Sequence, residues 1–148
     1  MLSTTQAAAL AGFGLTSVLV ALFIPMAERA ALLDHPTERK CHIAPTPVVG
    51  GVAMYLGVLA SVLLAELRFE TLGPLLAGAT LLVAVGFLDD IKPLSFQVRL
   101  LAQCIAAGFL SIWGGLTIHG LGDLLGLGPI PLGILATPFT LFAIVGLV

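Results

Sequence analysis

Long apolar runs alternate with short polar stretches along this chain, and the runs have the length of membrane-spanning helices. The first run, Ala7 to Ala27, carries no charge and, at about 1.5 Å per residue, reaches about 31 Å, enough for a hydrocarbon core of roughly 30 Å. Similar runs predict further spans at 48–65, 71–88, 100–118 and 132–148. The pattern therefore predicts an all-α integral membrane protein, a polytopic helical bundle with about five transmembrane helices in one membrane domain, residues 1–148.

The composition agrees with this pattern. Apolar residues make up 59% of the chain, charged residues 9%, and the mean hydropathy is +1.15, whereas soluble domains carry about 25% charged residues. A net charge of -2 and the lack of a Lys/Arg stripe exclude nucleic acid as a partner and leave the lipid bilayer. The first run is too long for a signal peptide and follows no basic residue, so we expect it to remain uncleaved.

The basic residues predict an orientation. Five of the six Lys and Arg residues fall in the loops of one side, and one falls on the other. The five are Arg29, Arg39, Lys40, Lys92 and Arg99, and the single one is Arg68. Because short loops with excess Lys and Arg stay in the cytoplasm, the N-terminus is predicted to lie outside and the loops at 28–47 and 89–99 inside.

Two adjacent carboxylates, Asp89 and Asp90, stand at the end of the third apolar run. An ionised group costs a few kcal/mol at the bilayer centre and far less at its edge, so we expect the pair at the edge. Mg²⁺ prefers one or two carboxylates together with phosphate oxygens and water, and a carboxylate is also a candidate proton acceptor. The alternative without chemistry is that both side chains cap the following turn, 91–99, and face water.

A second group of polar residues precedes the second apolar run. Lys40, His42 and Thr46 come before the pair Gly50-Gly51, which opens that run. Helix starts favour anions, so this segment is a candidate pyrophosphate site, with an ordinary basic cytoplasmic loop as the alternative. Both groups fall on the same predicted face of the membrane.

Together these segments resemble the polyprenyl-phosphate N-acetylhexosamine-1-phosphate transferases, of glycosyltransferase 4 type. The residues that carry the resemblance are Asp34-His35-Pro36-Thr37-Glu38-Arg39-Lys40-x-His42, then Pro45-Thr46-Pro47-x-x-Gly50-Gly51, and then Gly86-Phe87-x-Asp89-Asp90 with Leu94-Ser95 and Gln103. Within the family the chain most resembles the bacterial undecaprenyl-phosphate N-acetylglucosamine-1-phosphate transferases that begin O-antigen, common-antigen or teichoic-acid linkage synthesis in the cell envelope.

The resemblance implies a Mg²⁺-dependent reaction, with Mn²⁺ as the alternative ion, in which undecaprenyl phosphate attacks the β-phosphate of a UDP-N-acetylhexosamine and UMP leaves. It also implies a multi-pass protein of the bacterial inner membrane with a cytoplasmic site, and it leaves a homodimer open. Asp89 and Asp90 match the family's first acidic motif, credited with metal binding or with deprotonating the lipid phosphate. The expected phosphate or nucleotide contacts are Lys40, His42, Thr46, Gly50, Gly51 and Lys92.

Two departures from the family pattern matter. Pro93 stands where many members have a third Asp, and the family's second acidic segment would begin after Val148. Because the last apolar run also ends without a basic or aromatic anchor, we expect this chain to be the N-terminal half of a longer transferase.

Three other classes stay open on the residues alone. A UbiA-type prenyltransferase also uses Asp-rich motifs with Mg²⁺, but its Asn-x-x-x-Asp-x-x-x-Asp spacing is not found in the sequence. A transporter fragment would carry charged residues or Asn and Gln in mid-span; Gln103 is the only such side chain within a predicted span, and it falls near the cytoplasmic edge of its run. The third class is a small non-catalytic membrane protein.

The orientation is testable by labelling single cysteines in a background without Cys41 and Cys104. A cysteine in place of Lys92 or His42 should react only from the cytoplasm, and one in place of Arg68 only from outside, because of the basic bias. Labelling of position 92 from outside in intact cells would overturn the orientation.

Overall fold

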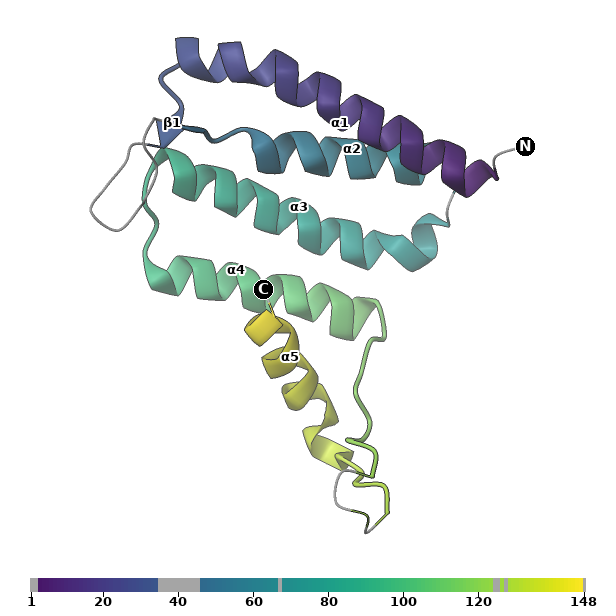
Figure 1. Ribbon diagram of the computed structural model, residues 1–148. Coiled ribbons are helices and arrows are strands. Elements are labelled where there is room, and N and C mark those ends of the chain that lie inside the picture. Colours follow the sequence, from purple (N-terminus) through teal and green to yellow (C-terminus); the bar gives the residue numbers. More distant parts are fainter. Residues whose placement is uncertain (1–2, 35–45, 67, 124–125, 127, 148) are drawn as a thin grey trace. The chain divides into compact units, whose positions relative to one another are not determined.

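The computed structural model describes residues 3–34, 46–66, 68–123, 126 and 128–147 (Figure 1). The chain divides into two compact units. The first consists of Met1–Arg68 and Val83–Leu94, and the second of Phe69–Leu82 and Ser95–Val148. The long helix α3 (Phe69–Ile91) contributes its first half to the second unit and its last turns to the first.

Helices α1 (Thr4–Arg29) and α2 (Gly50–Leu64) lie side by side in the first unit (Figure 1). A capping box starts α1: the Oγ of Ser3 accepts the N–H of Gln6 at 3.2 Å, and the Oε1 of Gln6 accepts the N–H of Ser3 at 3.0 Å. The cap explains why the helix begins three residues before the apolar run, because both partners precede Ala7.

A reciprocal glycine contact joins α1 to α2. A Cβ at Gly12 would lie 2.9 Å from the carbonyl oxygen of Gly57 and would overlap the Ser61 hydroxyl. A Cβ at Gly57 would in turn lie 2.9 Å from the carbonyl oxygen of Gly12 and would overlap the Thr16 hydroxyl. Small residues four positions apart on each helix thus let the two backbones touch, as is typical of helix pairs in membranes.

A short ladder holds the end of α1 near the start of α2. Strands β1 (Leu33–Asp34) and β2 (Thr46–Pro47) pair antiparallel, with Leu33 opposite Pro47 and Asp34 opposite Thr46. Beside the ladder, the N–H of Val48 donates to the carbonyl oxygen of Leu32 at 3.3 Å. Asp34 and Thr46 therefore lie opposite each other, and the chain enters α2 directly after the ladder.

In the second unit, α4 (Phe96–Gly108) packs against the first half of α3. The Oγ of Ser95 accepts the N–H of Val98 at 3.4 Å and caps α4. The helix continues as a π-helix, η1 (Phe109–Trp113). A Cβ at Gly78 of α3 would lie 3.3 Å from the carbonyl oxygen of Ala106, so close packing fixes this pair of helices as well.

The fourth helical stretch differs in its bounds from the predicted span 100–118. It runs from Phe96 to Trp113, because Ser95 supplies an early cap and the chain turns at Gly114 and Gly115, the latter with a φ of 66°. The described residues that follow have no regular helix or strand up to η2, apart from an isolated bridge between Gly120 and Pro131.

Helix α5 (Ala136–Leu147) follows a 3₁₀ turn, η2 (Gly133–Leu135). The side chain of Thr140 is fully buried. Its Oγ1 accepts the N–H of Ile118 at 2.8 Å and donates to the carbonyl oxygen of Ala136 at 2.7 Å. This hydroxyl links the chain after η1 to the last helix.

Small residues dominate the buried positions, while large apolar side chains such as Phe13, Ile112 and Phe142 are exposed. An apolar exterior of this kind suits a lipid solvent. Among the described residues, three helical stretches are long and apolar enough to cross a bilayer, namely α1, α3 and Phe96–Trp113. The predicted class, an all-α membrane protein, is confirmed. Because α2 and the η2–α5 stretch are shorter, the count of five spans remains a prediction.

The glycine contact predicts an asymmetry between two glycines of α1. Gly12→Ala should destabilise the first unit by about 1–3 kcal/mol through overpacking, seen as a lower unfolding temperature in detergent. Gly14→Ala is the matched control, because a Cβ at Gly14 would meet no atom within 4 Å. Equal stability of the two variants would show that α1 and α2 do not meet at Gly12.

Candidate functional site

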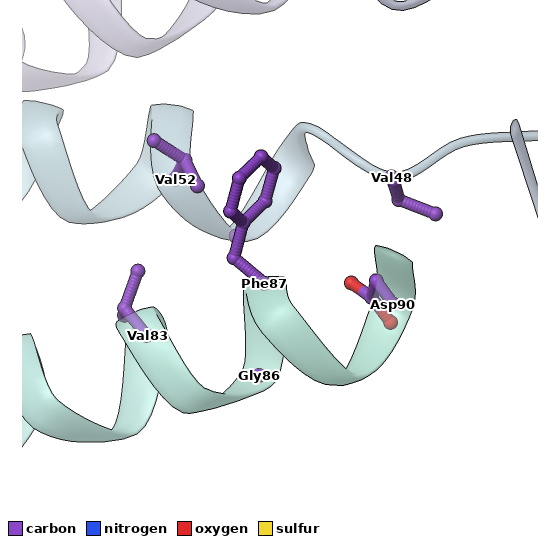
Figure 2. Close-up of a pocket in the computed structure, with 7 residues that line it drawn as sticks. Val48, Val52, Val83, Gly86, Phe87 and Asp90 are labelled. Atoms are coloured by element: carbon purple, nitrogen blue, oxygen red, sulfur yellow. The ribbon is translucent and has the colours of Figure 1, made fainter. Parts of the chain in front are cut away.

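One face of the last turns of α3 lines a small cavity in the first unit. Val83, Gly86, Phe87 and Asp90 have the i, i+3, i+4, i+7 spacing of a single helix face. The cavity has a volume of about 130 Å³ and is completed by Val48, Gly51 and Val52. Figure 2 shows Phe87 and Asp90 pointing from α3 toward α2 and the chain at Val48. Asp90 is the one ionisable residue in the lining.

The neighbouring carboxylate, Asp89, has a different environment. Successive residues of a helix are about 100° apart around its axis, and Asp89 does not line the cavity. Its Oδ1 instead accepts the backbone N–H of Leu94 at 2.6 Å, and its side chain is half-buried while Asp90 is exposed. The two aspartates were predicted as one pair, but they have different environments. Asp89 contacts the turn that follows α3, as in the alternative in which the aspartates only cap that turn.

The electrostatics of this helix end favour a cation. Asp89 and Asp90 lie in the last turn of α3, where the unpaired carbonyls already give the helix its negative pole. Acidic residues there make the electrostatic potential more negative. Lys92, the exposed residue that ends the helix, carries one positive charge close by. A divalent cation would be attracted to this negative potential.

The opposite wall of the cavity comes from the start of α2, whose first two residues are Gly50 and Gly51. The residue before them, Val49, makes no side-chain cap bond, so the first N–H groups of α2 are without a side-chain acceptor at the cap. A Cβ at Gly51 or Gly86 would meet no atom within 4 Å, so packing does not require these glycines. Their size leaves the cavity open beside a helix start that favours an anion.

The other predicted site residues lie around this cavity or outside the described residues. Thr46 is exposed in β2, just before the α2 start. Lys92 follows Asp90 by two residues, and its backbone N–H donates to the carbonyl oxygen of Leu88 at 2.8 Å. Lys40 and His42 lie outside the part of the chain that the structure describes. The structure thus brings Asp90 together with Gly51 and leaves the predicted contacts of the loop untested.

The donors fit a hard cation that takes its remaining ligands from elsewhere. Within the described residues, no group of three His, Cys, Asp or Glu side chains gathers that could enclose a metal. A closed site such as those of structural zinc needs four protein ligands. Mg²⁺ instead keeps several waters and binds through one or two carboxylates plus phosphate oxygens, so Asp90, alone or with Asp89, is a sufficient protein contribution.

The sequence alone did not identify the apolar residues that line the cavity as part of a site. Phe87, Val83 and Val52 lie in apolar runs where most residues are apolar, so composition gives none of them a role. The available signal was the helical spacing that leads back from Asp90, since residues three, four and seven positions earlier share its face.

Comparison with known proteins places the chain in a family. The model of Glycosyl transferase family 4 matches residues 72–148. A decaprenyl-phosphate N-acetylglucosaminephosphotransferase from Mycobacterium leprae (strain TN) is 37% identical over 120 residues, 71% of this chain and 30% of its own length. An undecaprenyl-phosphate alpha-N-acetylglucosaminyl 1-phosphate transferase from Yersinia pestis is 33% identical over 119 residues, 80% of this chain and 33% of its own.

The similarity extends further along the chain in another relative. The undecaprenyl-phosphate alpha-N-acetylglucosaminyl 1-phosphate transferase of Salmonella typhi is 30% identical over 132 residues, 89% of this chain and 36% of its own length. The chain therefore spans about a third of the length of the curated relatives it matches. No solved structure matches it.

The contact between Asp89 and Leu94 is testable by hydrogen exchange. Asp89→Ala should speed exchange of the Leu94 amide roughly tenfold, the equivalent of one lost hydrogen bond, whereas Asp89→Asn keeps an oxygen acceptor and should change it little. Asp90→Ala is the control and should leave the Leu94 amide as it is. Equal exchange in Asp89→Ala and wild type would mean that Asp89 does not hold the turn.

Proposed function

Because the chain belongs to glycosyl transferase family 4, we propose that it carries part of the site of an enzyme that transfers a sugar-1-phosphate to a polyprenyl phosphate. The relatives named above are phosphotransferases of N-acetylglucosamine and a polyprenyl phosphate. Undecaprenyl phosphate and a UDP-N-acetylhexosamine are the proposed substrates. The family match favours this function over a UbiA-type prenyltransferase, a transporter fragment or a non-catalytic membrane protein.

The observation that carries the proposal is the position of Asp90 in one cavity with the start of α2. The carboxylate would hold Mg²⁺, and the first N–H groups of α2 at Gly50 and Gly51 would hold a phosphate oxygen. Such a cavity pairs a cation ligand with an anion site. This combination suits the joining of two phosphate-bearing substrates, which repel each other until their charge is compensated.

In the proposed reaction, an oxygen of the lipid phosphate attacks the β-phosphorus of the UDP-sugar. A new P–O bond forms there, the bond from that phosphorus to the oxygen of the α-phosphate breaks, and UMP leaves with the electron pair. The products are a lipid diphosphate sugar and UMP. A bound Mg²⁺ supplies positive charge that offsets the negative charge of the phosphate oxygens.

We favour binding of a metal ion over abstraction of a proton as the role of the aspartates. The second pKa of a phosphate monoester is about 6, so near neutral pH most of the lipid phosphate already has an ionised oxygen for the attack. A general base would then add little, whereas repulsion between the substrates remains. We therefore assign Asp90 the role of cation ligand, and Asp89 the roles of fixing the turn before α4 and adding negative charge beside it.

The predicted orientation supports the same proposal. If the basic bias sets the topology, the Asp90 cavity would lie on the cytoplasmic side of a bacterial inner membrane, where nucleotide sugars are found, with the lipid substrate in the bilayer beside it. Lys92 and Arg29 would add positive charge at this face, which raises the local concentration of anionic substrates.

Removing one charge at a time tests the proposal in the whole product of the gene. Asp90→Asn and Asp89→Asn should each lower turnover by at least about 10²-fold, with membrane expression near wild type. Asp89→Asn is informative because its amide oxygen still accepts the Leu94 N–H, so a loss of activity reports on charge and not on the turn. The assay is transfer of radiolabelled sugar phosphate to lipid across a Mg²⁺ titration.

Glu70→Gln is the matched control, since it removes a carboxylate from the first turn of the same helix. It should keep turnover near wild type. Lys92→Ala should cost less than either Asn variant, and its effect should shrink at higher salt. Near-normal turnover in both Asn variants would overturn the proposed role of the aspartates.

A further inference from the structure

The described residues between η1 and α5 include two arms that pair with each other in the second unit. These hairpin arms are residues 114–123 and 128–135, and the second arm includes η2. The N–H of Leu121 donates to the carbonyl oxygen of Ile130 at 3.0 Å, and the N–H of Ile130 donates to that of Gly122 at 3.1 Å. Backbone groups that pair with each other need no water. These hydrogen bonds therefore lower the cost of moving the arms from water into a less polar environment.

The composition of the hairpin arms is unusual for a loop in water. Leu and Ile fill seven of their 18 positions, and Lys, Arg and Glu are absent from them. Asp123 is their single carboxylate. Because soluble domains carry about 25% charged residues, arms of this composition favour an apolar partner over bulk water.

The large apolar side chains at the outer ends of the arms do not pack inward. Ile134 is 94% exposed, Leu135 is 61% exposed and Leu116 is 55% exposed. Trp113, the residue before the first arm, is exposed as well. Exposed apolar side chains that are concentrated in one part of a chain mark a surface for a partner or for lipid.

The preceding helical stretch sets the depth of the arms. Phe96–Trp113 has 18 residues, which at about 1.5 Å each reach about 27 Å, close to the roughly 30 Å of the hydrocarbon core. Trp113 would therefore lie at the edge of the membrane, where tryptophan is enriched. Figure 1 shows the chain after η1 turning sideways from the axis of α4 instead of continuing along it. When this stretch crosses the bilayer, the arms run along the membrane surface.

We propose that the hairpin arms lie in the lipid–water interface at the Trp113 end of α4 and anchor the helices on either side of them. Leu116, Ile134 and Leu135 contact the acyl chains, and Asp123 faces water. The partner is the apolar boundary of the bilayer and not a particular head group, because the arms have no Lys or Arg to attract anionic lipid. The inference does not depend on the function proposed for Asp90.

Spin labels measure the depth of the arms. Single nitroxides at Ile134→Cys, Leu116→Cys and Asp123→Cys are placed in the whole product of the gene, freed of its other cysteines and reconstituted in phosphatidylcholine vesicles. Asp123 is the matched control, because it is an exposed residue of the same arms. The ratio of oxygen to nickel-chelate collisions should be at least about fivefold higher at 134 and 116 than at 123, because oxygen enters the acyl chains and a polar chelate stays in water.

Two results would overturn the inference. Free access of the nickel chelate at all three positions would place the arms in water. Low access of both oxygen and the chelate at 134 and 116 would mean that another segment of protein covers them.

The composition of the vesicles tests the chemistry of the partner. Replacing part of the phosphatidylcholine with phosphatidylglycerol should leave the collision ratio at 134 unchanged at low and high salt, because the arms carry no basic residue. Burial of position 134 only when phosphatidylglycerol is present would show recognition of an anionic head group and would contradict the proposal.

A polar substitution tests the anchor itself. Ile134→Asp adds a charge that favours water and should raise the access of the nickel chelate to a label at 116 by about threefold or more. Because Ile134 is almost fully exposed, the change should leave folding intact. Ile134→Leu keeps an apolar side chain and should leave the label at 116 as it is. Equal access at 116 in both variants would show that Ile134 does not hold the arms in lipid.

Discussion

Two carboxylates at the carbonyl end of an apolar helix are the electrostatic constraint on which the site depends. Asp89 and Asp90 both raise the negative potential at the end of α3. The two carboxylates are accommodated in different ways. Asp89 accepts the N–H of Leu94 and so turns the chain toward the start of α4, while Asp90 projects into a cavity opposite the positive start of α2. This arrangement is the basis of the proposal that a cation and an anion bind next to each other here.

Small residues bring the start of α2 to that place. Because Gly12 and Gly57 let α1 and α2 touch, and because the ladder of β1 and β2 returns the chain from Asp34 to Thr46, α2 begins close to the end of α1. The same arrangement creates an apolar groove between α1 and α2. Close packing at glycine therefore helps to position both the Asp90 cavity and the apolar groove.

Much of this arrangement can be predicted from the sequence. The apolar runs predicted the membrane class, and the ordered motifs between Asp34 and Gln103 predicted the family. The different environments of Asp89 and Asp90 were not predicted. The two residues are adjacent in the sequence and were treated as one pair, but successive side chains of a helix point about 100° apart around its axis. The wall at Phe87 and Val52 was also missed. In a membrane helix apolar residues occupy every face, so hydrophobic periodicity does not reveal which face meets another helix.

The proposed role of Asp90 as a ligand of a divalent cation can be measured directly with Mn²⁺ in place of Mg²⁺. Binding to the whole product of the gene is followed by the loss of the free-ion EPR signal, with and without prenyl phosphate. Wild type and Glu70→Gln should bind Mn²⁺ more tightly when prenyl phosphate is present, and Asp90→Asn should lose this binding. Mn²⁺ affinity in Asp90→Asn equal to that of wild type, with prenyl phosphate present, would contradict the assignment of Asp90 as the cation ligand.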